Sequence, residues 1–473
     1  MKAFRPQSSP VDPVGDAPAH TDDFMFFHRP MTHANDSQEL NAQRHRNAFL
    51  ADGEHVPIGQ ARDRISRETV TSTISTPKFD TSAMDGYALS SSATQDATID
   101  HPVTFEVKGM IAAGDEPLWI AADEQSGTPV CVEIMTGAPF PTGVGGNELD
   151  CCVRNEDVAV TVDETSNRRY IRVVKPAKTQ QNRRFAGSDF KKSDILVDAG
   201  EVIHPGHILS MASVGMTQIA VTRKPRVAVV STGSELLPPG LDQSPLHRIS
   251  DANGPYLTAT LESWGATVDF LGIIQDHAED LEQALRLTLG QKAYDVIITS
   301  GAVSAGRCDL VRRLNARVVF HKVAMRPGHP VLFAQIPDSS NTDGHLRRET
   351  AFFGLPGNPV ASAACLRFLV LPYLKYLQLQ RPDDPSSASL LLPDDAETAT
   401  TKEHPVVSTF CGDMDVFRPA LVRGSSGHVQ VKLIQDHSPG KIRPFLHSNC
   451  WIHIHRGVSE LKAGDIVDIY PSH

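Results

Sequence analysis

Three loops between residues 232 and 359 carry residues suited to binding phosphate. Each follows a continuous apolar run and combines Gly with Ser, Thr, Asn or Pro. Where a strand ends in a Gly-rich turn before a helix, backbone N–H groups and the helix N-terminus favour a bound anion. One such loop is more often only a turn, but three in one region favour a phosphate-bearing ligand. The loop residues are Thr232, Gly233, Ser234 and Glu235; Ser300, Gly301, Ser304 and Gly306; and Pro356, Gly357, Asn358 and Pro359.

Two aspartates lie close to these loops in the sequence. Asp309 follows the second loop, and Asp251 precedes a predicted helix near Gly254. Carboxylates beside a phosphate are ligands that Mg²⁺ prefers. Either aspartate could instead cap the helix that follows it. Both interpretations stay open for Asp251, whereas for Asp309 we favour the metal.

A basic turn, Arg326-Pro327-Gly328-His329-Pro330, follows the apolar segment VVFHKVAM. Two prolines around a glycine fix a rigid turn, which would hold two basic side chains in place for a small oxyanion. A solvated basic loop is the alternative, and the spacing does not distinguish the two.

An acidic residue in the first half of the chain, Asp85, stands just before a glycine in the segment SAMDGYA. An ordinary turn also places Asp at such a position. The composition of this segment does not choose between a functional carboxylate and a turn.

The elements that must position the three loops alternate between strand and helix. The pattern βαβα predicts a doubly wound α/β domain at residues 225–378 that binds its ligand beyond the carboxyl ends of the strands. No GxGxxG opens any of the βαβ units, which argues against a nucleotide-binding oxidoreductase. The predicted strands are PRVAVVSTGSEL, TVDFLGII, YDVIITSG and AFFGLPGNP, and the predicted helices are NGPYLTATLESWG, HAEDLEQALRLTL and ASAACLRFLVLPYLKYLQ.

The remainder of the chain predicts three further parts and a tail. Short β-branched segments at 100–180 indicate a small inserted β domain between two pieces, 38–99 and 181–224, of a composite N-terminal domain. Residues 385–473 indicate a C-terminal β-barrel-like domain. Residues 1–37 are polar and Pro-rich, and we expect them to be disordered. The predicted fold class is therefore multidomain α/β plus β.

Composition narrows the classes of partner. The formal net charge is −11 with no long basic run, so we expect no nucleic-acid partner. No stretch approaches the roughly 18 apolar residues of a membrane span, and we expect a cytoplasmic protein that binds no membrane. The seven cysteines include no CxxC pair and are expected to be reduced. His453 and His455 would share one face of a strand; without a third ligand we favour solvated residues over a metal site.

These segments, in this order, resemble the MoeA and gephyrin E-domain family, the molybdopterin molybdenumtransferases. The resemblance spans residues 56–378, and only loosely the part after 385. It implies a dimer of four-domain chains that uses Mg²⁺, takes adenylylated molybdopterin and molybdate, and releases molybdenum cofactor and AMP. The matching pieces are PKFDTSAMDGYAL, TGAPFP, FAGSDFKKSDILVDAG, PRVAVVSTGSEL, SDANGPYL, GAVSAGRCD, KVAMRPGHP and GLPGNPVASA.

The resemblance also assigns roles to residues of this chain. The three loops, with Asn253, would hold the phosphate and nucleotide of the ligand. Asp309 and Asp251 would lie near the metal. The resemblance implies catalytic roles for Asp309, Asp85 and Ser304, and further acidic groups of the N-terminal part at Asp150 and Glu156. Molybdate would be held by Arg326, His329, Pro330 and Ser362.

Departures from the family pattern gather around the expected molybdate site. Gly301-Ala302 stands where two glycines are usual, and Arg326 and His329 stand where two lysines are usual. Ala361, followed by Ser362, replaces a serine, and GVGGNEL inserts residues ahead of Asp150. Two hypotheses follow: an active molybdenum insertase, or a divergent paralogue that binds molybdopterin or a protein partner as a carrier or scaffold. We favour the insertase.

The expected partners also follow from the resemblance. The chain carries one α/β domain of the relevant kind, so we expect the molybdopterin adenylyltransferase to be a separate chain. Cofactor-free molybdoenzymes would receive the product, and the chain itself is expected to form a homodimer.

Overall fold

The computed structural model describes most of the chain after residue 45. It divides into two compact units, His55–Val221 and Met1–Glu54 with Thr222–His473. The expected tail at 1–37 lies outside the described residues, and so do Ser304, Gly306 and Asp309 of the second loop. The described residues are 46–47, 49–50, 52–121, 127–144, 148–240, 247–275, 277–301, 311, 313–337, 349–380, 383–391, 406–409, 412–425, 428–434 and 438–472.

A six-stranded sheet forms the centre of the α/β domain, in the order β18-β15-β19-β23-β22-β20. The first four strands run parallel, as predicted for a doubly wound fold. The last two strands differ, because β22 pairs antiparallel with β23 and β20 pairs antiparallel with β22. Antiparallel neighbours do not need the helical crossover that joins parallel strands. The strands are β15 (Arg226–Thr232), β18 (Thr267–Ile274), β19 (Val296–Ser300), β20 (Arg317–His321), β22 (Leu332–Pro337) and β23 (Glu349–Leu355).

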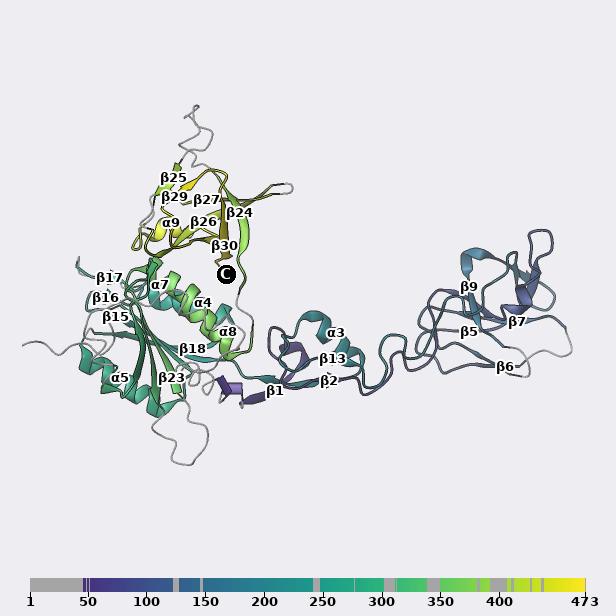
Figure 1. Cartoon of the computed structure of the whole chain (residues 1–473). Coiled ribbons are helices and arrows are strands. Elements are labelled where there is room, and N and C mark those ends of the chain that lie inside the picture. Colours follow the sequence, from purple (N-terminus) through teal and green to yellow (C-terminus); the bar gives the residue numbers. More distant parts are fainter. Residues whose placement is uncertain are drawn as a thin grey trace, which may run out of the picture. The chain divides into compact units, whose positions relative to one another are not determined.

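Helices cover both faces of this sheet (Figure 1). Alternate residues of β15 point to opposite faces: Val227 and Val229 lie in one hydrophobic cluster, and Ala228 and Val230 lie in the other. The first cluster includes α4 and the α7–α8 helix, and the second includes α5. The helices are α4 (Asn253–Ser263), α5 (Ala278–Gln291), α7 (Pro359–Cys365), the π-helical segment η5 (Leu366–Val370) and α8 (Leu371–Leu377).

One helix among the described residues, Pro359–Leu377, is long and apolar enough to cross a membrane by length and composition. This corrects the expectation that no stretch of the chain approaches the length of a membrane span. Because 83% of its apolar window is buried inside the protein, this segment serves as a core helix of the α/β domain. Tyr373, fully buried, packs against Phe333 and Phe353 of the sheet.

The C-terminal strands form a closed barrel. The order is β21-β26-β27-β24-β30-β28, and an additional pairing of β26 with β28 closes the ring. This confirms the predicted barrel-like fold; β21, from the α/β part, joins it by pairing with the start of β26. The elements are β21 (Met325–Arg326), β24 (Ser386–Leu390), β25 (Val406–Thr409), β26 (Asp415–Ser425), β27 (His428–Leu433), α9 (Ile442–Leu446), β28 (Cys450–Ile454), β29 (Glu460–Lys462) and β30 (Ile466–Pro471).

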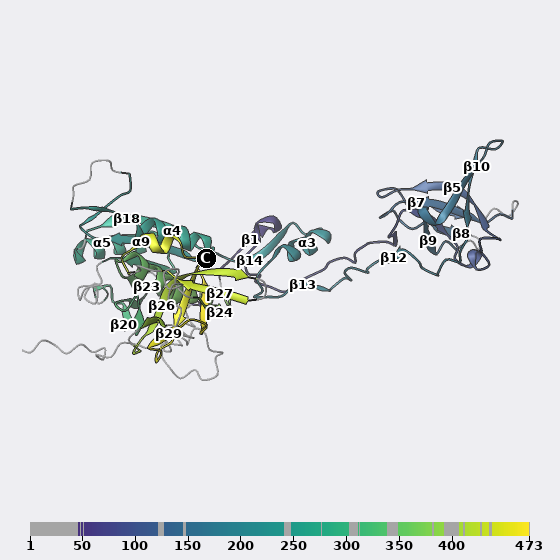
Figure 2. The same ribbon diagram turned by 90° about the horizontal axis from the view of Figure 1, so that it is seen from above.

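The second unit contains another six-stranded sheet, in the order β10-β11-β5-β7-β4-β9 (Figure 2). Cys151 and Cys152, adjacent on β9, are buried in different clusters on its two faces. Because β4 pairs with both β7 and β9, this sheet includes residues that the sequence analysis assigned to the composite domain. The strands are β4 (Gly86–Leu89), β5 (Val103–Ile111), β7 (Val130–Ile134), β9 (Cys151–Arg154), β10 (Val158–Asp163) and β11 (Arg168–Val173).

Short two-stranded pairs join sequence before the sheet to sequence after it. β1 pairs with β14, β2 with β13 and β3 with β12. Residues on either side of the insert therefore fold together, and α3 packs with them. The elements are β1 (Gly53–Pro57), η2 (Ile58–Gln60), β2 (Val70–Thr71), β3 (Thr81–Ser82), η3 (Ser92–Thr94), β6 (Trp119–Ala121), β8 (Thr142–Val144), η4 (Asn155–Asp157), β12 (Arg183–Arg184), β13 (Ile195–Val197), α3 (Pro205–Ser213), β14 (Gln218–Thr222), β16 (Leu236–Leu237) and β17 (Ile249–Ser250).

Candidate functional site

The three predicted loops meet at one edge of the α/β sheet. Strands β15, β19 and β23 are adjacent and parallel, so the residues that follow Thr232, Ser300 and Leu355 all leave the same edge. The Thr232 hydroxyl donates a hydrogen bond to the Ser300 carbonyl, 3.1 Å away, and joins the first two loops. The structure therefore brings the described parts of the predicted phosphate loops together.

Gly301 stands where the loops approach most closely. Its φ is +113°, and a Cβ built on it would lie 1.9 Å from the Thr232 carbonyl oxygen. A Cβ on Gly357, in the third loop, would lie 3.4 Å from the Gly301 Cα. Only glycine fits at 301, for both backbone conformation and space. The absent side chain lets the backbones of all three loops converge.

Asn253, the first residue of α4, ties two of these loops to each other. Its Nδ2 donates to the Ser300 hydroxyl at 2.8 Å and to the Gly357 carbonyl at 2.7 Å. Its Oδ1 is buried and has no hydrogen-bond partner among the described residues. Asn253 therefore sets the spacing of the loops and keeps one acceptor unused.

Asp251 supports both of its predicted roles. Its Oδ1 accepts a hydrogen bond from the Gly254 N–H at 3.0 Å, as a helix cap does. Its Oδ2 is buried and, within the described parts of the chain, makes no hydrogen bond. Asp251 directly follows the short parallel pair β16–β17, and its N–H donates to the Leu237 carbonyl beside the first loop. A buried carboxylate oxygen without a partner is suited to a cation.

The predicted oxyanion turn packs on the helix that follows the third loop. Gly328 has a φ of +115°, and a Cβ on it would lie 2.7 Å from Cys365 Sγ on α7. Ser362, three residues before Cys365, is fully buried, with its hydroxyl oxygen 3.5 Å from the Ser300 hydroxyl oxygen. The turn, α7 and the end of β19 thus form one packed group, but Ser362 faces the strand end rather than solvent.

The two basic side chains of the turn differ in how they can meet an oxyanion. Arg326 is exposed, and its Nε donates to Met414 Sδ at 3.3 Å. His329 Nδ1 lies 2.7 Å from the Val323 carbonyl, which can only accept, so Nδ1 carries a proton. Nε2 then donates to an anion only when the imidazole is charged. Pro330, half-buried, follows directly.

A barrel turn that the sequence analysis did not assign also reaches this site. The Pro439 carbonyl accepts a hydrogen bond from the Val360 N–H at 3.0 Å, and a Cβ on Gly440 would lie 3.6 Å from Asn358 Oδ1. Lys441 comes next. The sequence signal that could have indicated this turn is a Pro-Gly pair followed by a basic residue, within the segment predicted as barrel.

The predicted acidic residues of the other unit do not form one group. The Asp85 carbonyl accepts from the Asn155 N–H, so Asp85 and Glu156 lie near the same end of the β4–β9 pair. Asp150 lies at the opposite end, where its carboxylate accepts from Ser91 N and Oγ. Hydrogen bonds from the Thr136 N–H and then its hydroxyl lower the pKa of Asp85, which is exposed.

Comparison with known proteins decides the family. A molybdopterin molybdenumtransferase from Haemophilus influenzae is 30% identical over 89% of this chain and 95% of its own length. Another, from Synechococcus elongatus, is 31% identical over 68% of this chain and 74% of its own length.

This chain belongs to the molybdopterin molybdenumtransferase family.

Family models and a solved structure locate this resemblance along the chain. Residues 35–215 match the MoeA N-terminal region (domain I and II), 228–376 match a probable molybdopterin binding domain, and 412–472 match the MoeA C-terminal region (domain IV). A crystal structure of a molybdopterin biosynthesis MoeA protein from Pyrococcus horikoshii superposes with a TM-score of 0.68 at 26% identity, over 91% of this chain and 98% of the other. The predicted family and fold class are both confirmed.

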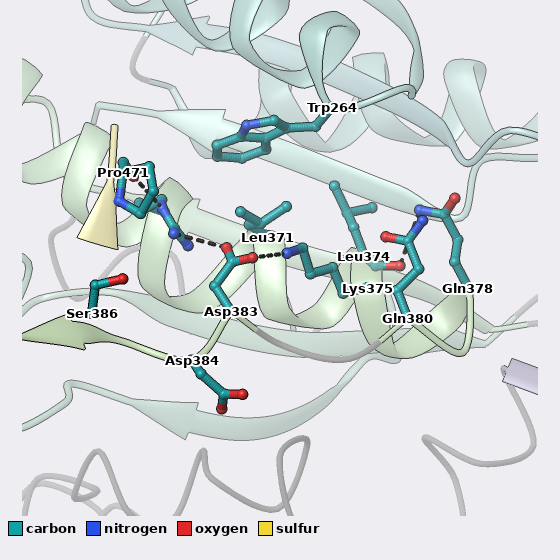
Figure 3. Close-up of a pocket in the computed structure, with 11 residues that line it drawn as sticks. Trp264, Leu371, Leu374, Lys375, Gln378, Gln380, Asp383, Asp384, Ser386 and Pro471 are labelled. Carbon is teal, nitrogen blue, oxygen red and sulfur yellow. Dashed lines mark hydrogen bonds and ion pairs between the residues drawn. The ribbon is translucent and has the colours of Figure 1, made fainter. Parts of the chain in front are cut away.

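A cavity of about 420 Å³ lies apart from the loop edge of this molybdopterin molybdenumtransferase family member (Figure 3). Trp264 lines it from beyond the C-terminal end of α4, whereas Asn253 begins α4 at the loops. Three of its charged side chains already pair with one another, because Asp383 binds both Arg367 and Lys375. Burial lowers the pKa of Arg367. We therefore assign the ligand site to the loops and not to this cavity.

Proposed function

We propose that this chain is a molybdenum insertase that transfers molybdate into adenylylated molybdopterin, with Mg²⁺-dependent release of AMP. Membership of the molybdopterin molybdenumtransferase family supports the general reaction. The observation that carries the assignment to this edge is the convergence of three backbone loops around Gly301. Molybdopterin, its adenylate and molybdate are substrates in this proposal.

The phosphates of the ligand would be held by backbone rather than by lysine or arginine side chains. Helices α4 and α7 both begin at this edge, at Asn253 and Pro359. Helix N-termini carry a favourable potential for anions, although the Gly254 and Val360 N–H groups of these two helices already donate to Asp251 and to the Pro439 carbonyl. Asn253 holds Ser300 and Gly357 at a fixed spacing, so the loops are arranged before the ligand arrives.

Molybdate would bind beside these loops at the turn that carries Arg326 and His329. Arg326 supplies a permanent charge and several donors. His329 supplies an Nε2 donor when charged, because Nδ1 is held by the Val323 carbonyl. The buried hydroxyl of Ser362 lies 3.5 Å from the Ser300 hydroxyl, on the helix whose Cys365 contacts the turn at Gly328, and we assign it a supporting role in positioning.

Asp251 fits a Mg²⁺ site, since its Oδ2 is a buried oxygen without a hydrogen-bond partner among the described residues. We propose that it holds the ion together with Asp309, which lies outside the described residues. When bound, Mg²⁺ offsets negative charge on the phosphates and favours cleavage of the adenylate link. The capping bond to Gly254 fixes the orientation of the carboxylate for this role.

The proposal includes the partners expected from the sequence. A homodimer would contribute acidic residues, of which Asp85 and Glu156 lie near each other. A separate adenylyltransferase would supply the substrate, and cofactor-free molybdoenzymes would take the product. A cytoplasmic location stays a prediction.

A bacterial strain that lacks its own molybdopterin molybdenumtransferase provides a test in cells. Production of this chain is expected to restore molybdoenzyme activity, whereas a Gly301→Val variant, folded as judged by circular dichroism, is expected not to restore it. A chain that binds molybdopterin yet fails to restore activity would instead be a carrier or scaffold.

A further inference from the structure

Three side chains that commonly bind metal ions lie together in the C-terminal barrel. One donor atom from each of Asp415, His453 and His455 lies within 4.8 Å of the other two. β26 and β28 pair antiparallel, with Phe417 opposite His453 and Val416 opposite Ile454. Continuing this register places Asp415 opposite His455. Side chains two residues apart on a strand share a face, so all three meet on one face of the β26–β28 pair.

Each imidazole in this cluster is held by a carboxylate. His453 Nε2 lies 2.8 Å from Asp415 Oδ1, and His455 Nε2 lies 2.8 Å from Asp468 Oδ2 on β30. Metal-bound histidines usually have a carboxylate on the ring nitrogen that does not bind the metal, and Asp468 holds this position at His455, whereas Asp415 at His453 is itself a member of the cluster. The Arg456 N–H also donates to Asp415 Oδ1, at 3.2 Å. The donor groups are therefore already oriented by the strands.

The cluster has a buried side and an open side. His453 is only 7% exposed and Asp415 only 8%, so the expectation that His453 is a solvated residue is wrong. Phe417 stacks on the His453 ring with centroids 4.5 Å apart. The His455 side chain, in contrast, is 59% exposed and leaves a path from solvent. The third ligand that the sequence spacing lacked is Asp415, which lies 38 residues away along the chain.

We propose that Asp415, His453 and His455 bind a divalent transition-metal ion of the zinc class. Two imidazole nitrogens and one carboxylate oxygen form a donor set typical of zinc. Donor atoms about 2.1 Å from zinc lie roughly 3.4 Å from one another in a tetrahedral site. The donor atoms, which lie within 4.8 Å of one another, therefore need to approach by at most about 1.4 Å, and His455 is the exposed side chain of the three. The ion takes the place of the proton between His453 and Asp415, and water fills the fourth position.

The alternative to a metal site is a buried ion pair between His453 and Asp415, which does not explain the position of His455. A buried ion pair needs only one histidine, yet the His455 ring lies 4.0 Å from the His453 ring, centroid to centroid. A shared metal ion explains the second ring, because both imidazoles can offer a nitrogen to the same ion.

The site lies next to the basic turn without depending on its function. The Asp415 N–H donates to the Ala324 carbonyl at 3.0 Å, and Asp415 pairs with Met325 in the β21–β26 ladder. Arg326 follows at once. A bound ion would therefore join β26 and β28 at the point where the barrel holds this turn.

Titration of the full chain with Zn²⁺ alone, after removal of metals with a chelator, tests the proposal without substrate or turnover. We expect one equivalent to bind with micromolar or tighter affinity and to raise the unfolding temperature. Co²⁺ is expected to give visible d–d absorption typical of low coordination number. His455→Gln, a change at an exposed residue that preserves folding, is expected to weaken binding at least tenfold, and Asp468→Asn roughly tenfold.

His447→Gln is the matched control, since His447 is an exposed histidine of the same barrel and should leave the affinity unchanged. The proposal is overturned by wild-type protein that fails to bind Zn²⁺ at micromolar concentrations. It is also overturned if His455→Gln binds as tightly as wild type, because the ion then sits elsewhere. Neither outcome bears on the insertase proposal, whose assay uses molybdopterin.

Discussion

Replacing Asn253 with alanine tests whether the loops are held ready for phosphate. The change removes two hydrogen bonds, to the Ser300 hydroxyl at 2.8 Å and to the Gly357 carbonyl at 2.7 Å. Such bonds between neutral groups contribute about 0.5–1.5 kcal/mol each. Water can replace the bond at Gly357, which is exposed, and Ser300 keeps weaker contacts. We therefore expect a loss of about 1–2 kcal/mol, or roughly 5- to 30-fold in affinity.

Isothermal titration with adenylylated molybdopterin measures this loss directly. Inorganic pyrophosphate serves as a second probe that reports the phosphate loops alone. Glu262→Ala, at an exposed position on the same helix, is the control and should bind as wild type does. If the folded Asn253→Ala protein binds both probes within about twofold of wild type, the loops do not need Asn253 and the reasoning is refuted.

Three further predictions concern the turn, the close approach and the sheet. His329→Ala should weaken molybdate binding, measured by equilibrium dialysis, because it removes the ring that the Val323 carbonyl orients in the basic turn; an affinity equal to that of wild type contradicts this. Gly301→Ala forces its Cβ toward the Thr232 carbonyl and should abolish pyrophosphate binding and lower the unfolding temperature; retained binding contradicts this. Hydrogen bonding, first from Lys292, lowers the pKa of Asp269. The charged Asp269 side chain therefore contributes about 0.5 kcal/mol to the free energy of unfolding, a value discounted for its partial exposure. This contribution is present above about pH 4 and is lost as the pH falls through the lowered pKa. Asp269→Asn should thus lower the urea midpoint at pH 7 but little at pH 3, and an equal loss at both values would contradict this.

The α/β domain could be predicted because its signals are local. Val227, Val229 and their neighbours form apolar runs of strand length, and Gly follows where the loops leave the sheet. The same reasoning could not predict that β20 and β22 return antiparallel, because strand pairing depends on the final packing of the sheet. Nor could it place β4 in the inserted sheet, since both of its partners lie more than 40 residues later.

The candidate site was predicted as residue types but not as contacts. The sequence alone predicted that Gly301 and Gly357 belong to the loops. It could not predict that a side chain at 301 is excluded by the carbonyl of Thr232, a strand residue nearly 70 positions earlier. The capping bond and the unpaired oxygen of Asp251 are properties of the folded backbone. Pro439 was missed because its contact with α7 crosses from one domain to another. Tertiary contacts of this kind leave no periodic trace in the sequence.

The insertase assignment is tested most directly by mixing the purified chain with adenylylated molybdopterin, Mg²⁺ and molybdate. AMP release and activation of a cofactor-free molybdoenzyme are then measured together. We predict that both appear and that both require Mg²⁺. If the ligand binds but neither product forms, the chain is a carrier or scaffold and the insertase account is contradicted.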